Sequence, residues 1–234
     1  MKIALLGYGK MGKTIEQIAL KRGHEIVIKA SIENPEYDIT KADIAIDFSM
    51  PSAAVGNISN CFNNGVPVIS GTTGWLEDYD KMTALCNEKQ GGFIYASNFS
   101  LGVNIFFELN KTLAKMMSSL DQYNISMEEV HHTQKLDEPS GTAISLANDI
   151  ISEHKSYEKW ALNTPETDTI PIIAKRIPEV PGTHIVTYNS SVDAITIEHK
   201  AHNREGFALG AVVAAEWLQG KTGVFSMKDV LNIG

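Results

Sequence analysis

The chain has 234 residues, enough to bury a substantial core in one large domain or two small ones. Its formal net charge of −8 argues against bulk attraction to nucleic acid or to an anionic membrane surface. Cys61 and Cys86 lack a CxxC spacing, so neither a disulfide framework nor a zinc site is expected. The first apolar run, about five residues long, is too short for a signal peptide, and no segment approaches membrane-spanning length. We therefore expect a cytoplasmic protein.

Residues 1–98 alternate between short apolar runs and segments with helical spacing. The run KIALLG ends at a glycine, and the helical pattern KTIEQIALKRG and the apolar run HEIVIKA follow it. Further strands are expected at ADIAIDFS, VPVISGTTG and GGFIYASNFS, with helices at AAVGNISNCFNNG and LEDYDKMTALCNEKQ. Strands that alternate with helices predict βαβ units, so we expect an α/β domain with a parallel sheet over residues 1–98.

The pattern changes after residue 98. GVNIFFELNKTLAKMMSSL predicts a long helix, YNISMEEVHH a strand and SGTAISLANDIISEH another helix. Residues 155–182 contain four prolines and are expected to be irregular. GTHIVTYNSSVDAITIEHKAH predicts a hairpin that turns at Asn189–Ser190, and EGFALGAVVAAEWLQG predicts a closing helix. This second region should therefore be α+β, with a mixed or antiparallel sheet.

The stretch GYGKMG fits the pattern G-x-G-x-x-G between a predicted strand and a predicted helix. The first glycine would permit the tight turn, the second the close approach of a pyrophosphate, and the third the packing of helix on strand. The N–H groups at the helix start would then face the phosphates. A merely structural turn is the alternative. The predicted cofactor contacts in this loop are Gly7, Tyr8, Gly9, Lys10, Met11 and Gly12.

The end of the second predicted strand bears on the choice between NADH and NADPH. An NAD site usually has an acidic residue there to bind the ribose hydroxyls. Here Ala30 and Ser31 occupy that place, Lys29 lies beside them, and Glu33 is the nearest carboxylate. A nearby lysine without an acid would tolerate a 2′-phosphate, which favours NADPH while leaving NADH usable. Ser31 is a candidate cofactor contact.

Two further loops follow predicted parallel strands, at the sheet edge where ligands bind in open α/β folds. In SGTTG, Gly71 would allow close approach of a flat ring, and Thr72 and Thr73 offer hydroxyls. An ordinary glycine loop is the alternative. YASNFS ends the next strand in the same way. Asp47 could end a strand near the nucleotide or could simply cap that strand.

The stretch EVHHTQKLDEPSGTA concentrates groups that bind anions. In a strand, His131 and His132 would point to opposite faces, which argues against a simple metal pair. Lys135 adds a positive charge, and the turn Pro139–Thr142 would place free N–H groups at a helix start. We expect a carboxylate-binding site beside a proton donor. A histidine taken alone could equally be structural.

The charged residues nearer the C-terminus carry weaker signals. His184, His199 and His202 are expected to be structural or surface residues. Arg176 and Arg204 could be charge partners in the site.

Several motifs together resemble the 4-hydroxy-tetrahydrodipicolinate reductase (dihydrodipicolinate reductase) family of bacterial lysine and diaminopimelate biosynthesis. EVHHTQKLDEPSGTA is similar to the family signature E-x-H-H-x-x-K-x-D-x-P-S-G-T-A. GTTG, SNFSLGVN and GKTGVFSMKDVL match in family order, so the resemblance spans nearly the whole chain. The glycine loop is one residue shorter than the G-x-x-G-x-x-G form common in longer members.

The resemblance implies an oxidoreductase that uses NADPH or NADH to reduce a small cyclic dicarboxylate with loss of water. It implies a Rossmann-type cofactor domain formed by residues 1–98 and 206–234. Residues 99–205 would form a substrate-binding domain that also builds a homotetramer. No metal is implied, and neither nucleic acid nor membrane is an expected partner.

The resemblance also assigns residues. The catalytic acid falls on His131 and a second catalytic donor on Lys135, and which of the two delivers the proton stays open. His132 would contact substrate, and Gly141 and Thr142 would hold its carboxylate. Further candidate contacts are, for the substrate, Ser140 and Thr73, and, for the cofactor, Gly71, Thr72, Thr73, Ala96, Ser97, Asn98 and Phe99.

Three other functions fit part of the sequence. A nucleotide-sensing regulator would share the glycine loop without needing the His–Lys cluster. A metal-dependent hydrolase could use His131 and His132. A different NAD(P)-linked dehydrogenase acting on an aspartate-derived substrate is the nearest competitor.

Overall fold

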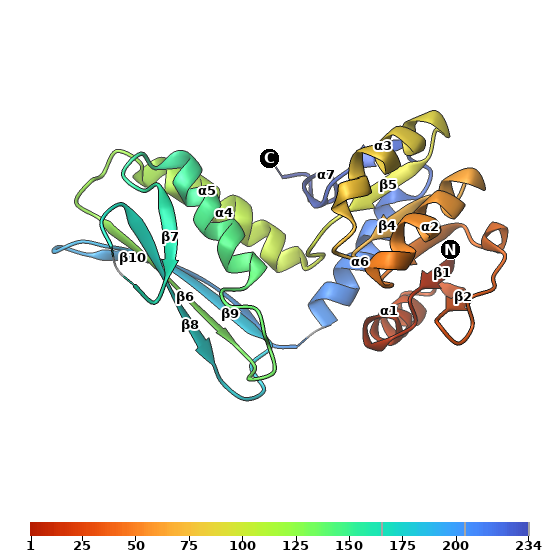
Figure 1. The fold of residues 1–234 in the computed structure, drawn as a ribbon, viewed down its shortest axis with the longest axis horizontal. Helices are drawn as coiled ribbons and strands as arrows, with labels where there is room; N and C mark the ends of the chain where they lie inside the picture. The colour runs from red at the N-terminus through yellow and green to blue at the C-terminus, as the bar shows by residue number, and fades with distance from the viewer. Residues whose placement is uncertain (165, 204, 234) are drawn as a thin grey trace. The chain divides into compact units, whose positions relative to one another are not determined.

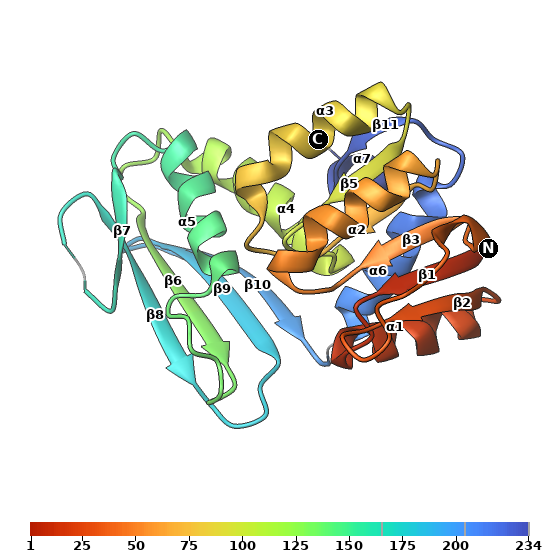
Figure 2. The same ribbon diagram turned by 45° about the vertical axis from the view of Figure 1, so that its right-hand side comes forward.

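The computed structural model describes residues 1–164, 166–203 and 205–233. The chain divides into two compact units, the first formed by Met1–Asn104 with Glu205–Gly234 and the second by Ile105–Arg204. Each unit has its own sheet, as the ribbon views show (Figures 1 and 2), and each has its own apolar core. None of the described helices is long and apolar enough to cross a membrane.

The first unit contains a parallel sheet that, in the described residues, has six strands in the order β11-β5-β4-β3-β1-β2. The strands are β1 (Lys2–Leu6), β2 (Glu25–Ala30), β3 (Ile44–Asp47), β4 (Val68–Ser70), β5 (Gly92–Tyr95) and β11 (Gly223–Phe225). The strand order reverses beside β1, which has β2 on one side and β3 on the other. In open α/β sheets, ligands bind beyond the carboxyl ends of the strands at such a switch point.

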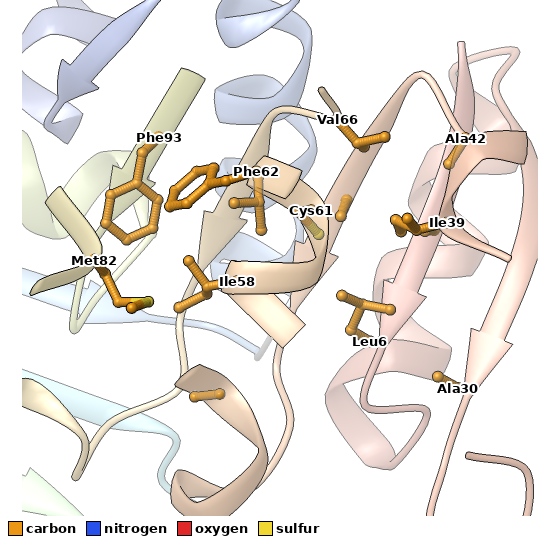
Figure 3. Close-up of a cluster of buried hydrophobic side chains, with 14 of the residues drawn as sticks. Leu6, Ala30, Ile39, Ala42, Ile58, Cys61, Phe62, Val66, Met82 and Phe93 are labelled. Carbon is orange, nitrogen blue, oxygen red and sulfur yellow. The ribbon is translucent and has the colours of Figure 1, made fainter. Parts of the chain in front are cut away.

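Helices cover both faces of this sheet. They are α1 (Lys10–Lys21), α2 (Pro51–Asn63), α3 (Tyr79–Glu88), α6 (Glu205–Leu218) and α7 (Met227–Leu231), with the 3₁₀ turns η1 (Ile39–Lys41) and η2 (Leu76–Asp78). Leu5 points to the layer of α1, α6 and α7, whereas Leu6 points to the layer of α2 and α3. In that second layer Phe62 packs edge-on against Phe93, with ring centroids 5.5 Å apart (Figure 3). The predicted α/β class is confirmed.

The second unit has a mixed sheet in the order β10-β9-β6-β8-β7. Its elements are α4 (Leu101–Met117), which begins in the first unit, β6 (Asn124–His131), α5 (Gly141–Glu153), β7 (Lys159–Leu162), β8 (Thr169–Arg176), β9 (Gly182–Asn189) and β10 (Ala194–Ala201). β6 pairs parallel with β8 and antiparallel with β9. Helices α4 and α5 pack on one face around Leu146, Ile150 and Tyr188. On the opposite face lies Ile173, which is exposed.

The expectation that residues 155–182 are irregular is wrong, because β7 and β8 lie there. Pro171 is the third residue of β8 and pairs with Ala161 of β7, whereas the ladder with β6 begins only at Ile172. The missing N–H of the proline therefore falls before β8 becomes a central strand, where it is tolerated. The predicted hairpin of β9 and β10 is confirmed.

Candidate active site

The turn between β1 and α1 has the form of a phosphate cradle. Gly7 has a φ of +100°, and a Cβ there would lie 2.1 Å from the carbonyl oxygen of Phe48. A Cβ on Gly12 would lie 2.4 Å from the carbonyl oxygen of Gly7. At Gly9 a Cβ would meet no protein atom within 4 Å. The fold therefore requires glycine at Gly7 and Gly12, whereas at Gly9 it leaves space over a helix start that no side chain caps. This geometry fits a dinucleotide pyrophosphate.

Lys29, the cation proposed to tolerate a 2′-phosphate, is paired within the protein. Its Nζ lies 2.6 Å from Oε1 of Glu16 on α1 and 5.1 Å from the centroid of the Tyr8 ring. The Tyr8 hydroxyl donates a hydrogen bond to the other oxygen of Glu16. Hydrogen bonds from Lys29 and Tyr8 hold the pKa of Glu16 below its usual range. Ser31 follows β2 directly and its hydroxyl oxygen accepts a hydrogen bond from the Asn34 N–H.

The loop after β4 is anchored by Asp47, which is fully buried at the end of β3. The Thr72 hydroxyl donates to one carboxylate oxygen of Asp47 at 2.7 Å, as does the Ser70 hydroxyl at 2.9 Å. The Ser49 hydroxyl and the Asn57 amide donate to the other oxygen, at 2.6 and 3.0 Å. The Thr72 hydroxyl therefore donates its hydrogen bond within the protein, and Thr72 is buried. The side chain of Thr73 is exposed.

The loop after β5 holds the remaining candidate cofactor contacts, Ala96, Ser97, Asn98 and Phe99. Asn98 is fixed through both its oxygens, because Oδ1 accepts from the Ser100 N–H at 2.9 Å and the carbonyl accepts from Asn104 at 2.9 Å. Phe99 is buried and its ring packs against Phe48. Any contact of Phe99 with a cofactor would therefore use its backbone.

In the second unit, strand alternation places Glu129 and His131 on the same face of β6. Glu129 is completely buried. Its Oε1 accepts hydrogen bonds from both terminal nitrogens of Arg176, at 3.2 and 3.1 Å, and its Oε2 accepts one from the Ser140 N–H at 3.0 Å. The Nδ1 atom of His131 lies 3.4 Å from Oε2. Arg176, a possible charge partner from the sequence, is therefore the ion-pair partner of Glu129.

His184, expected to be structural or on the surface, is buried in this cluster. Its Nε2 lies 3.1 Å from the Ser140 hydroxyl and 3.8 Å from Oε2 of Glu129, and its ring meets that of His131 edge-on with centroids 5.1 Å apart. The Ser140 hydroxyl also accepts the Ala143 N–H and so caps α5. His184 reaches the cluster through the register of the β6–β9 pair, in which it lies opposite Glu129, and no local sequence pattern indicates this pairing.

Burial and neighbouring charges set the protonation of the two histidines. Burial lowers the pKa of His131, Lys135 and Arg176 lower it further, and Glu129 and Asp137 oppose them. Burial lowers the pKa of His184 to about 3, so this ring is neutral at pH 7. His131 is thus the member of the pair that can carry a proton nearer neutral pH.

The segment between β6 and α5 carries Lys135, whose Nζ lies 2.8 Å from both carboxylate oxygens of Asp137. His132 lines a cavity of about 460 Å³ together with Gln134, His202 and residues 178–181. His131, the last residue of β6, is buried, whereas His132 follows the strand and lines the cavity, so the two histidines have different surroundings. The first N–H groups of α5, at Gly141 and Thr142, lie at a helix start where an anion is favoured.

Among the described residues, Glu129, His131 and His184 have potential ligand atoms within 4.8 Å of one another. Arg176 already occupies one oxygen of Glu129, and the Ser140 N–H occupies the other. Both carboxylate oxygens of Glu129 therefore already accept hydrogen bonds within the protein. Arg204, the other arginine singled out in the sequence, lies outside the described residues.

A glycine cradle on a parallel sheet and a buried histidine beside a helix start define the class: an NAD(P)H-dependent oxidoreductase with an anionic substrate. Comparison with known families identifies which one. The family model described as "Dihydrodipicolinate reductase, N-terminus" matches residues 1–99, and the model for the C-terminus matches residues 102–231. The chain belongs to the dihydrodipicolinate reductase family.

Individual relatives agree. A 4-hydroxy-tetrahydrodipicolinate reductase from Christiangramia forsetii is 57% identical over 234 residues, covering 99% of this chain and 98% of the relative. A reductase of the same name from Methanosarcina barkeri is 37% identical over 232 residues, covering 97% and 83%. A dipicolinate-bound dihydrodipicolinate reductase from Paenisporosarcina sp. TG-14 shares the fold, with a TM-score of 0.76, 24% identity and 97% of each chain covered.

This family performs the reduction of 4-hydroxy-tetrahydrodipicolinate in lysine and diaminopimelate biosynthesis, with NADH or NADPH as cofactor. Family membership favours that activity over the regulator, the hydrolase and the other dehydrogenase that the sequence left open.

Proposed function

We propose that this chain reduces 4-hydroxy-tetrahydrodipicolinate to tetrahydrodipicolinate and that His131 is the acid of the reaction. The observation that carries the residue assignment is the buried cluster around His131, beside the N-terminus of α5. The net reaction takes up one proton, transfers one hydride and releases the 4-hydroxyl as water. When bound, the nicotinamide supplies the hydride. The protein must supply the proton and hold a small dicarboxylate.

The second unit offers groups for each of these tasks. His131 gives the proton, since it is the histidine of the pair whose ring is not held neutral by a pKa of about 3. The N–H groups of Gly141 and Thr142 receive a substrate carboxylate at the positive end of α5. Lys135 contributes a second positive charge, because a flexible ammonium can exchange the exposed Asp137 for a substrate carboxylate. His132 contacts the substrate from the cavity that it lines.

The two units divide the work. The first binds NADH or NADPH through the loop Gly7–Gly12, supported by the loops at Gly71–Thr73 and Ala96–Phe99 and by Ser31. The second binds substrate. Support for the cofactor loop comes from Gly9, where the protein leaves open space that its own packing does not need.

We further propose that the protein is a homotetramer assembled through the second unit and that it acts in the cytoplasm. The face of the second sheet opposite α4 and α5 exposes Ile173, 43% accessible, beside the surface ion pair of Lys175 and Glu128. A partner copy would cover this apolar side chain. Sedimentation that gave a monomer at micromolar concentration would contradict the tetramer.

The activity is tested by supplying the product of the preceding synthase and following the loss of reduced cofactor, separately with NADH and NADPH. His131→Gln is expected to lower kcat by about 10²–10⁴-fold, the usual contribution of a positioned acid, while NADH still binds. Lys135→Ala should weaken substrate binding and reduce turnover. His154→Gln is the matched control, because His154 is a buried histidine of the same unit outside the cluster. Near-normal turnover of His131→Gln would overturn the assignment of the acid.

A further inference from the structure

The carboxylate of Glu129 is a charge that stability alone does not explain. A buried ion pair such as Glu129–Arg176 seldom stabilises a fold more than apolar residues of similar size would, because both charges lose water. The side chain of Glu129 has no exposed surface, and that of Arg176 is 18% exposed. Such a pair is expected where position matters, and the position of Glu129 is directly behind His131.

The two carboxylate oxygens of Glu129 have different surroundings. Oε1 is held by Arg176, which also donates to the carbonyl oxygen of Asp137 at 2.7 Å. Oε2 faces Nδ1 of His131 at 3.4 Å and Nε2 of His184 at 3.8 Å. His184 Nε2 has the nearer Ser140 hydroxyl as its partner. The buried Nδ1 of His131 makes no hydrogen bond within the described residues, and the oxygen it faces belongs to Glu129.

A carboxylate oxygen only accepts hydrogen bonds, so the ring nitrogen that faces it carries the hydrogen. The separation of 3.4 Å is long for a hydrogen bond, and such contacts in ligand-free sites commonly shorten when substrate binds. The other nitrogen, Nε2, points toward Gly182, where a Cβ would lie 3.1 Å away. The absence of a side chain at Gly182 leaves room beside Nε2.

We propose that Glu129 is a positioning residue that holds His131 in the tautomer with hydrogen on Nδ1, so that Nε2 delivers the proton. This inference rests on the proposed role of His131 as the acid. In the step, the Nε2–H bond of the imidazolium breaks, its electron pair stays on Nε2, and the proton passes to the substrate. The ring is left neutral with its hydrogen on Nδ1, facing Glu129. Because His131 supplies the proton, the ammonium group of Lys135 can serve to bind a substrate carboxylate.

The same geometry sets the pH range of the acid. The groups that face His131 are Glu129 on its own strand, Arg176 on β8, the neutral His184 on β9, and Lys135 and Asp137 from the loop before α5. The two cations disfavour the imidazolium, and Glu129 is the buried group that favours it. Neutralising Glu129 therefore lowers the pKa of His131. The alkaline limb of the pH–rate profile, where the acid loses its proton, moves toward lower pH.

The experiment has two arms. Nitrogen NMR of histidine-labelled wild-type protein, with His131→Gln to assign the signal, reports the tautomer directly. We expect hydrogen on Nδ1 in the neutral ring, and hydrogen on Nε2 would overturn the proposal. This arm needs no variant of Glu129 and so does not depend on whether such a variant folds.

In the second arm, Glu129→Gln should move the alkaline limb of kcat downward by about 1–3 pH units, the range for an opposite charge within a few ångströms. Glu129→Asp keeps the negative charge and should therefore show a pH dependence of kcat close to that of the wild type. Asp149→Asn removes a carboxylate of α5 that pairs with Lys111, and it should leave the profile unchanged. An unmoved limb in Glu129→Gln would overturn the proposal. If His131→Gln itself turned over normally, the proposed acid would fail instead, so the two failures are distinguishable.

Discussion

Substitution of Gly9 by alanine separates cofactor binding from folding. Gly9 has φ −84° and ψ −153°, a conformation open to any residue, and a Cβ there would meet no protein atom within 4 Å. The methyl group restricts the unfolded chain, which favours folding by about 0.4–1 kcal/mol, but Gly9 is the N-cap of α1, where alanine is less favourable than glycine by a similar amount. The two effects should nearly cancel, so the Tm of the apo protein should stay within about 4 °C of the wild-type value.

The same methyl group would occupy the space left for the pyrophosphate. Loss of one charge-assisted hydrogen bond costs about 1.5–3 kcal/mol, which corresponds to about a 10- to 150-fold weaker Kd for NADH. The assays are thermal unfolding of the apo protein and titration of NADH fluorescence. Gly12→Ala is the matched control, since its Cβ would lie 2.4 Å from the Gly7 carbonyl oxygen and should destabilise by about 1–3 kcal/mol. A Gly9→Ala variant that bound NADH normally, or that melted as low as Gly12→Ala, would refute the reasoning.

Three further outcomes are expected. Lys29→Ala leaves the Glu16 carboxylate without its cation, and the unpaired negative charge disfavours a 2′-phosphate. The affinity for NADPH should therefore fall by about 2–5-fold relative to the affinity for NADH, as measured by titration with each cofactor. Ser140→Ala removes the cap of α5 and should cost about 0.5–2 kcal/mol in denaturant unfolding; an unchanged midpoint would contradict the cap. Arg22 and then His24 hold the pKa of Glu216 below its ordinary value, so this carboxylate contributes stability above a pH of about 4.3 that is lost as pH falls. The Tm difference between wild type and Glu216→Gln should accordingly close in acid, and a constant difference would exclude the ion pair as its source.

The first unit was predictable because its signals are local. A parallel strand buried on both faces reads as a continuous apolar run, and β1, β3 and β4 are buried almost throughout. The glycine turn before α1 and the cap of α5 are likewise formed by consecutive residues, so a local sequence pattern indicates each of them. In the second unit Pro171 obscured β8, because a proline in a run argues against a central strand unless its partner register is known.

The sequence indicates the residues of the candidate site only where they are contiguous. His131, Lys135 and the start of α5 lie within one short stretch, whereas Arg176 and His184 come from other strands. Sheet register brings them together, with Arg176 opposite His131 and His184 opposite Glu129. Register depends on distant pairing, which no local pattern specifies. The hydrogen bond from the Thr72 hydroxyl to Asp47 could not be predicted for the same reason, because Asp47 lies on another strand.

The order of segments in the first unit has a consequence for its synthesis. Helix α6 contributes Ala208, Ala211, Val212, Ala214, Ala215 and Leu218 to the core around β1, and β11 forms the sheet edge beside β5. Both come from the last thirty residues of the chain. Domains usually fold from the N-terminus as the ribosome releases them. Here the first unit cannot complete its fold until the C-terminal segment has been synthesised. The second unit is continuous in sequence and can therefore fold first. Until α6 is in place, the nucleotide-binding sheet exposes one apolar face to chaperones.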